Sequence, residues 1–180
     1  MTEVKTVMLS PCFIKVDGMK IFNGSINDAY RTLINDYPKF FKMDGLCKIG
    51  FLGAELLLRC IASEDKENAA IILFGRAGSL STDRNYQKTI SNLNNYFPSP
   101  ALFVYTLANI VTGEIAIRHK IYGETSFYIT EENDPQMMET VIKSVFETSN
   151  PSLILAGWVD YETENNYLAE LKIVRNQKQS

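Results

Sequence analysis

Short apolar runs alternate along the chain with segments whose apolar residues recur every three or four positions. Short apolar runs bounded by turn-forming residues indicate β-strands. The run at residues 69–74 contains no polar side chain, which is typical of a strand covered on both faces. The pattern as a whole predicts five core strands, at residues 4–9, 69–74, 126–130, 153–159 and 168–174.

The strongest helical pattern lies at residues 44–61. Its apolar side chains recur at spacings of three and four, so one face of the helix must be buried. Gly50 and Gly53 lie inside this pattern, and glycine in a helix costs roughly 1 kcal/mol relative to alanine. Glycine at these positions therefore indicates close packing against a neighbouring element. Further helices are predicted at residues 25–33, 82–93, 106–119 and 134–148.

Turn and cap signals separate these elements. Asp17-Gly18, between short apolar runs, predicts a β-hairpin over residues 13–22. Asp134 and Pro135 are typical of a helix N-cap and of the first helical position. Strands interleaved with helices imply an α/β fold whose sheet has helices on both faces. We expect one domain over residues 1–175 and a polar tail at 176–180.

Composition narrows the classes of function. A net charge of −3 argues against a nucleic-acid or membrane surface. The N-terminus lacks a signal-peptide pattern, and no window approaches about 18 uninterrupted apolar residues. Cys12, Cys47 and Cys60 have no CxxC spacing and fit a reducing compartment, so the cytoplasm is the expected location. No cluster has metal-ligand spacing and no phosphate-binding loop is complete, so neither metal nor cofactor is expected.

Four segments, taken in order, resemble one enzyme family. Each is weakly specific alone, but together they resemble the N-terminal half of the β-ketoacyl-[acyl-carrier-protein] synthases, condensing enzymes of the thiolase-like fold. The resemblance implies a thiolase-like half with a five-stranded mixed sheet. The segments are Lys42-Met43-Asp44 with the helix 46–58, the strand and turn at 71–80, the proline loop 97–100 leading into 109–117, and the strand end Leu155-Ala156-Gly157-Trp158-Val159-Asp160.

The same resemblance marks two departures from the family. It places Glu132 where the family has its nucleophilic cysteine. The chain also stops where the family continues into a second half, which supplies two catalytic histidines. Acyl transfer in the family runs through a covalent thioester, whereas a carboxylate would form an anhydride that water destroys. We therefore expect no catalytic residue for condensation in this chain.

Two interpretations of Glu132 remain open. In the first, a carboxylate there would mimic an acylated enzyme, and the chain would act as a malonyl decarboxylase or an acyltransferase assembled with a partner synthase. The alternative is structural, because acidic residues at a helix start favour the helix dipole by roughly 0.3–1 kcal/mol. The only histidine, His119, follows Arg118 and precedes Lys120 at a helix C-terminus. A solvated helix end explains this trio more simply than contact with an acidic acyl carrier protein.

The strand before Glu132 carries the expected contact with a partner. In the family, the equivalent strand is a sheet edge that pairs with its counterpart in another subunit. We therefore expect Thr125, Phe127 and Ile129 to form a dimer seam, in a homodimer or in a heterodimer with a full-length synthase. The resemblance implies a truncated, non-catalytic subunit, a pseudoenzyme, in fatty-acid, polyketide or aryl-polyene biosynthesis.

Overall fold

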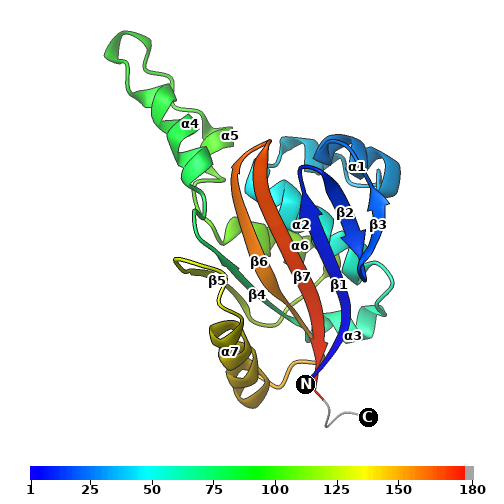
Figure 1. The fold of residues 1–180 in the computed structure, drawn as a ribbon. Helices are drawn as coiled ribbons and strands as arrows, with labels where there is room; N and C mark the ends of the chain where they lie inside the picture. The colour runs from blue at the N-terminus through cyan, green and yellow to red at the C-terminus, as the bar shows by residue number, and fades with distance from the viewer. Residues whose placement is uncertain (177–180) are drawn as a thin grey trace.

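A seven-stranded sheet organises residues 1–176, which are the residues described by the computed structural model of the protein (Figure 1). Neighbouring strands follow the order β3-β2-β1-β7-β6-β4-β5 across the sheet. The strands are β1 (Thr2–Ser10), β2 (Phe13–Val16), β3 (Met19–Phe22), β4 (Ala70–Gly75), β5 (Thr125–Ile129), β6 (Ile154–Thr163) and β7 (Asn166–Arg175).

Helices connect the strands and cover parts of the sheet. They are α1 (Ile26–Leu33), α2 (Gly45–Leu58), α3 (Ser63–Glu67), α4 (Leu80–Ile90), α5 (Pro100–Phe103), α6 (Ile110–His119) and α7 (Pro135–Thr148), with the 3-10 turns η1 (Pro38–Lys42) and η2 (Leu93–Asn95).

The expectation of a five-stranded sheet is wrong, because the predicted hairpin joins the same sheet. Strand β2 pairs antiparallel with β1, Val7 lying opposite Val16, and β3 then pairs with β2. The turn has the left-handed backbone that its sequence predicts, with φ of 49° at Asp17 and 79° at Gly18. The hairpin was visible in the sequence, but the free edge of β1 that receives it depends on the tertiary arrangement.

The sheet is mixed, as the family resemblance implies. Strand β4 runs parallel to both β5 and β6, whereas β7 runs antiparallel to its neighbours β6 and β1. The carboxyl ends of the three parallel strands consequently meet at one edge of the sheet. In open α/β sheets this edge is where ligands commonly bind.

One face of the sheet is covered by α2 and α6. The glycines of α2 make the close contacts that the sequence predicts. A Cβ atom added at Gly50 would lie 2.5 Å from Val111 on α6, and one at Gly53 would lie 2.8 Å from Leu171 on β7. Helix α2 can therefore lie directly against both the sheet and its neighbouring helix.

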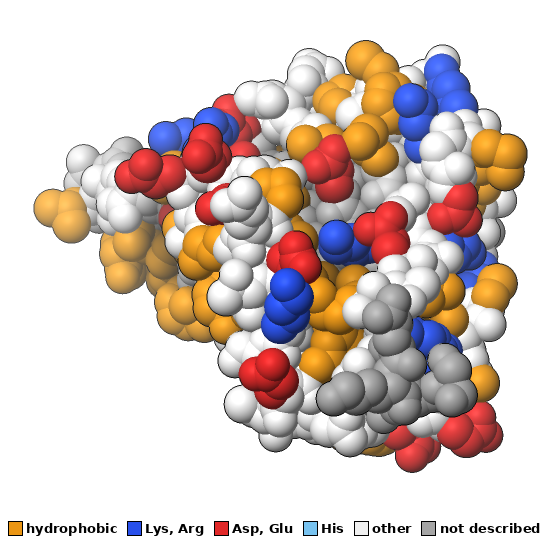
Figure 2. All heavy atoms as spheres, turned by 60° about the horizontal axis from the view of Figure 1, so that its bottom comes forward, with side chains coloured by type: hydrophobic (Ala, Val, Ile, Leu, Met, Phe, Trp, Pro, Cys, Tyr) orange, Lys and Arg blue, Asp and Glu red, His pale blue; other side chains and the backbone are white. Residues whose placement is uncertain are grey.

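The opposite face is covered only in part. Helix α7 packs Met138, Ile142 and Phe146 onto the apolar side chains of β4 and β6. Beside α7, over β1 and β7, residues 1–176 provide no covering helix, and a hollow of about 420 Å³ includes Met8, Glu170 and Lys172 in its wall. Helices on both faces are thus confirmed over β4 and β6 but not over β1 and β7. Figure 2 shows acidic and basic side chains interspersed on the side of the molecule that carries α7 and the N-terminus.

Several predicted boundaries move. The helix expected over residues 106–119 begins at Ile110, and the short helix α3, which was not predicted, follows α2. Pro100, the last residue of the proline loop at 97–100, is the first residue of α5, with the Ser99 side chain accepting a hydrogen bond from the Leu102 amide. The expected polar tail, apart from its first residue Asn176, lies outside the described residues.

Candidate functional site

The candidate site lies where the parallel strands end. Phe74 on β4 is level with Trp158 on β6, so Arg76, just past β4, is level with Asp160. Asp160 Oδ1 accepts hydrogen bonds from the backbone amides of Arg76, at 3.1 Å, and Ala77, at 2.8 Å. The Arg76 guanidinium also lies 2.5 Å from the Glu162 carboxylate. Asp160 therefore fixes the turn that leaves β4.

Glu132 lies beside this turn, in the loop that joins β5 to α7. Its backbone carbonyl accepts a hydrogen bond from the Thr130 hydroxyl at 3.0 Å, and its side chain is exposed. Glu132, Asn133, Arg76, Trp158 and Asp160 contribute to the wall of a hollow of about 280 Å³. The position that the resemblance equates with a nucleophile thus faces an open hollow at the sheet edge.

The start of α7 next to Glu132 is capped from within. Asp134 is the N-cap, and its carboxylate accepts hydrogen bonds from the amides of Gln136, at 2.8 Å, and Met137, at 3.1 Å. The cap and the first-turn proline confirm the sequence prediction for this helix start. The acidic turn therefore has a structural role that does not depend on Glu132 acting on a substrate.

The chemistry available in this hollow is limited. No cysteine, serine or histidine is among the described residues that line it. Carbonyl chemistry on a thioester also needs donors for the developing oxyanion. The two adjacent amides at the turn, of Arg76 and Ala77, already donate to Asp160. The hollow accordingly holds carboxylates and a guanidinium without a nucleophile for acyl transfer.

His119 lies far from this hollow. Helix α6 ends at His119 and leads into the start of β5, whereas Glu132 follows the end of β5. The five residues of β5 extend for about 17 Å, so His119 and Glu132 lie near opposite ends of this strand.

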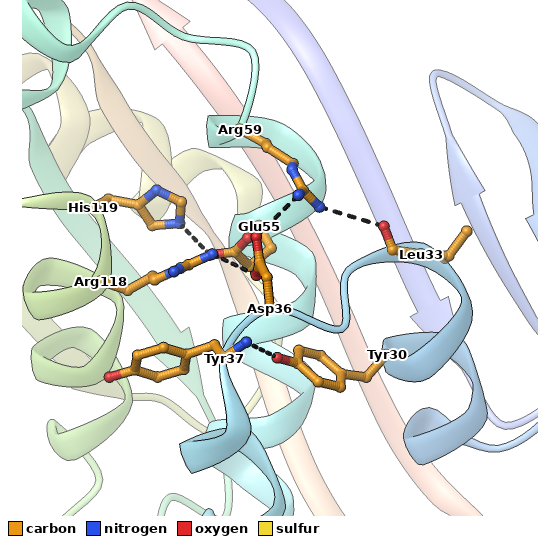
Figure 3. Close-up of polar contacts among 8 residues, drawn as sticks. All are labelled: Tyr30, Leu33, Asp36, Tyr37, Glu55, Arg59, Arg118 and His119. Carbon is orange, nitrogen blue, oxygen red and sulfur yellow. Dashed lines mark hydrogen bonds and ion pairs between the residues drawn. The ribbon is translucent and has the colours of Figure 1, made fainter.

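His119 is also buried, which corrects the expectation of a solvated helix end. Its Nε2 atom lies 3.2 Å from Oε1 of Glu55, a residue of α2 that is 1% exposed (Figure 3). Arg118 Nε donates to the same oxygen at 2.7 Å. Arg118 and His119 are thus committed to Glu55, and only Lys120 of the trio is exposed.

The ion network extends from Glu55 to the segment between α1 and η1. Arg118 also contacts Asp36 at 2.6 Å, and Arg59 at the end of α2 contacts the other oxygen of Asp36 at 3.0 Å (Figure 3). Burial by itself would raise the pKa of Glu55, but hydrogen bonds and charges from His119 and Arg118 outweigh it and lower this pKa to about 2. Sequence reasoning missed Glu55, although one acidic residue inside an otherwise apolar helical run was a usable signal.

A second buried carboxylate, Glu114 on α6, was also missed. Lys39 lies 2.7 Å from it, and the hydroxyl of Tyr105 donates to it at 3.3 Å. Burial, followed by the charge of Glu114, raises the pKa of Tyr105 well above its usual value. These contacts fix η1 and the residues before α6 to one another, and they make Glu114 a structural residue.

Strand β5 forms the free edge of the sheet, next to β4. The two residues that flank β5, Glu124 and Thr130, form hydrogen bonds with β4. The Glu124 carbonyl accepts one from the Ile71 amide, and the Thr130 amide donates one to the Gly75 carbonyl. Alternation along a strand directs the backbone groups of Thr125, Phe127 and Ile129 away from β4. Thr125 and Ile129 are exposed, whereas the Phe127 ring packs partly against the core. The edge position predicted for this strand is confirmed.

None of the three cysteines lines the hollow near Glu132. Cys47 is buried in the first turn of α2, and burial raises the pKa of its thiol. Cys12 and Cys60 are exposed. Within residues 1–176, no group of three or more acidic, cysteine or histidine side chains has the arrangement of a metal site. None of the helices in this part of the chain has the length and apolar character needed to span a bilayer.

Comparison with known proteins shows the fold. The structure described as the ishigamide ketosynthase/chain length factor matches with a TM-score of 0.67 and 15% identity, over 85% of this chain and 49% of that one. The ketosynthase ApeO in complex with its chain length factor ApeC, from Xenorhabdus doucetiae, matches with a TM-score of 0.69 and 12% identity, over 97% and 78%. The chain thus spans about half the length of the first of these proteins. No family model matches the sequence, and no curated protein matches it.

These structural matches establish that the chain has a ketosynthase-like fold. They agree with the mixed sheet and with the resemblance of the four sequence segments. At 12% and 15% identity the likeness concerns the fold alone.

Proposed function

We propose that the chain is a non-catalytic subunit that pairs through β5 with a full-length β-ketoacyl synthase. The carrying observation is the free edge of β5, whose residues Thr125, Phe127 and Ile129 direct their backbone groups outward. Residues 125–130 carry no charge, although charged side chains commonly protect an exposed sheet edge. An unprotected edge of this kind is a template for pairing with another strand.

The hollow beside Glu132 supports the non-catalytic part of the proposal. The position that the resemblance equates with the nucleophile holds the exposed carboxylate of Glu132, and the two amides of the nearby turn donate to Asp160. Both similar structures are described as a ketosynthase with a chain length factor. By analogy, this chain would fill the place of the second subunit in a fatty-acid, polyketide or aryl-polyene pathway, and the synthase would supply the cysteine and histidines.

The test is retention of a synthase by the tagged protein. The protein is immobilised and exposed to an extract of the cells from which it comes, and retained proteins are identified by mass spectrometry. We expect a full-length β-ketoacyl synthase that carries its reactive cysteine. If no such synthase is retained, the proposed function is wrong.

The seam itself is tested by Ile129→Pro. Proline removes the outward amide of Ile129 without removing a hydrogen bond to β4, and edge strands tolerate proline. We expect at least a tenfold loss of synthase affinity, about 1.4 kcal/mol. Ile129→Val keeps the amide and serves as the control, and the melting temperature of each variant reports its folding. Equal retention of synthase by both variants would place the seam elsewhere.

A further inference from the structure

Residues 80–107 form a projecting arm made of α4, η2 and α5. Figure 1 shows the arm extending from the end of β4, on the side of the sheet where β5 lies. No residue from 83 to 104 is buried. The arm is held mainly by its own contacts, such as the ring pair Tyr86–Phe103 at 5.4 Å and the Phe97 amide donating to the Thr89 carbonyl at 2.9 Å.

The surface of this arm is unusually apolar for a segment outside the core. Large exposed patches of this kind mark interaction sites on soluble proteins. The sequence carries no charged residue from Thr89 to Gly113, and interface centres are depleted in charge in the same way. The exposed large side chains on the arm are Leu80 (43%), Leu93 (91%), Tyr96 (59%), Phe97 (77%), Phe103 (59%), Val104 (51%) and Leu107 (62%).

The arm is anchored at its base and is continuous there with β5. Thr82 donates to the carboxylate of Asp44, the N-cap of α2, at 2.6 Å. A Cβ atom added at Gly78 would lie 2.9 Å from the Ile129 side chain and 3.3 Å from Ala108. The exposed seam residue Ile129 therefore lies beside Gly78, just before the arm begins, so the edge strand adjoins the base of the arm. The charged side chains of the arm, Asp83, Arg84 and Lys88, all lie on α4, whereas residues 89–107 and 125–130 carry no charge.

Strand β5 by itself is too small to form a specific protein–protein interface. A five-residue edge strand about 17 Å long covers on the order of 200 Å² when it pairs. A specific interface buries roughly 800 Å² on each partner. Aromatic side chains bury roughly 150–250 Å² each, so the exposed apolar side chains of the arm offer on the order of 700 Å² more. The arm and β5 together reach the required size.

We propose that the arm lies across the partner synthase and supplies most of the area buried in the pair that β5 begins. This inference rests on the proposed function, since its occupant is the same synthase. The chemistry that the partner must present is an uncharged, apolar surface beside its own edge strand. A protein surface fits better than a lipid surface, because the chain is net negative and its arm tip has no cation to attract a lipid headgroup.

The arm is tested with two double variants, Leu93→Ser/Phe97→Ser at the tip and Phe103→Ser/Leu107→Ser nearer the base. Leu93 and Phe97 are the more exposed pair, at 91% and 77%, and their replacement leaves the Tyr86–Phe103 ring pair intact, so the melting temperature of the tip variant should remain unchanged. The base variant removes Phe103 from that ring pair, so its melting temperature is measured as well and the tip variant decides where the two differ. The matched control is Met19→Ser/Ile21→Ser, which removes exposed apolar side chains from β3 at the opposite edge of the sheet. The probe is the synthase retained by the wild-type protein, with affinity measured by surface plasmon resonance.

We expect each arm variant to weaken synthase binding at least tenfold and the control variant to leave it unchanged. If Ile129→Pro abolishes binding while both arm variants bind like the wild type, the arm inference is wrong and the proposed function stands. If the wild-type protein binds no synthase, the proposed function itself fails. Arm-dependent self-association without a synthase, or arm-dependent binding to phosphatidylcholine vesicles, would also overturn the inference, because each gives the arm a different occupant.

Discussion

At the scale of single residues, two buried carboxylates hold distant parts of the chain together. Glu55 on α2 meets Arg118 and His119 on α6, and Glu114 on α6 meets Lys39 in η1. A buried charge is costly unless it is paired and hydrogen-bonded. Each pair therefore specifies where one element lies against another, and neither faces the hollow beside Glu132.

The pKa of Glu55 leads to a prediction about acid stability. A carboxylate whose folded pKa is depressed stabilises the fold above its unfolded pKa, and this contribution is lost as the pH falls towards the folded value. For Glu55 the window runs from about 4.5 down to about 2. We expect Glu55→Gln to lower the free energy of unfolding at neutral pH by about 3 kcal/mol, because Arg118 and His119 lose their partner.

The measurement is urea unfolding of both proteins at a series of pH values. The difference between wild type and Glu55→Gln should shrink as the pH falls from about 4.5 towards about 2. Glu139→Gln is the control, because Glu139 pairs on the surface of α7 with Lys143 and exposed pairs contribute little. A constant difference between wild type and Glu55→Gln across this window would contradict the assigned role of the ion pair.

At the scale of elements, the contact between α2 and α6 depends on Gly50. We expect Gly50→Ala to lower the free energy of unfolding by about 1–3 kcal/mol, because its methyl group would overlap Val111 and separate the helices. Gly113→Ala in α6 is the matched control, since a Cβ atom there meets nothing within 4 Å. Because alanine has a higher helix propensity than glycine, Gly113→Ala should stabilise the protein by about 0.5–1 kcal/mol. Urea unfolding measures the free energy of unfolding of both variants, and an equal change in the two would show that packing at Gly50 is not tight.

At the scale of the whole molecule, the proposed non-catalytic function predicts that the hollow beside Glu132 has no decarboxylase activity. We expect the purified protein to release no CO₂ from a malonyl-carrier protein above the buffer blank. When each is paired with the partner synthase, the Glu132→Ala variant and the wild type should release CO₂ at rates within about twofold of each other. The reason is that the amides of the nearby turn, which could stabilise an oxyanion, already donate to Asp160. CO₂ release that Glu132→Ala abolishes would instead support the decarboxylase interpretation.

The sequence predicted the elements that have strong periodicity or clear caps. Residues 69–74 became the buried strand β4, the glycines of the long helix mark real close contacts, and Asp134-Pro135 begins α7. The strand before Glu132 is an edge, as expected. These features are local or follow from which face must be buried, so they can be derived from spacing.

Contacts between distant residues could not be derived in this way. Glu55 and Arg118 are separated by 63 positions, and nothing in their local sequence pairs them. His119 was expected in solvent because a helix C-terminus favours a cation locally, whereas tertiary packing buries it against Glu55. The arm was expected only as a helix over residues 82–93 followed by the proline loop at 97–100, and its exposure is evident only in three dimensions.

By itself, the sequence determined the alternation of strands and helices and the glycine contacts of α2. These are properties of residue type and short-range spacing. Only the tertiary structure decided that the hairpin completes a seven-stranded sheet, that His119 and Glu55 share a buried network, and that an exposed, largely apolar arm lies next to the free edge of β5. The physical reason is that burial, pairing and exposure depend on which distant segments meet, and no local pattern contains that information.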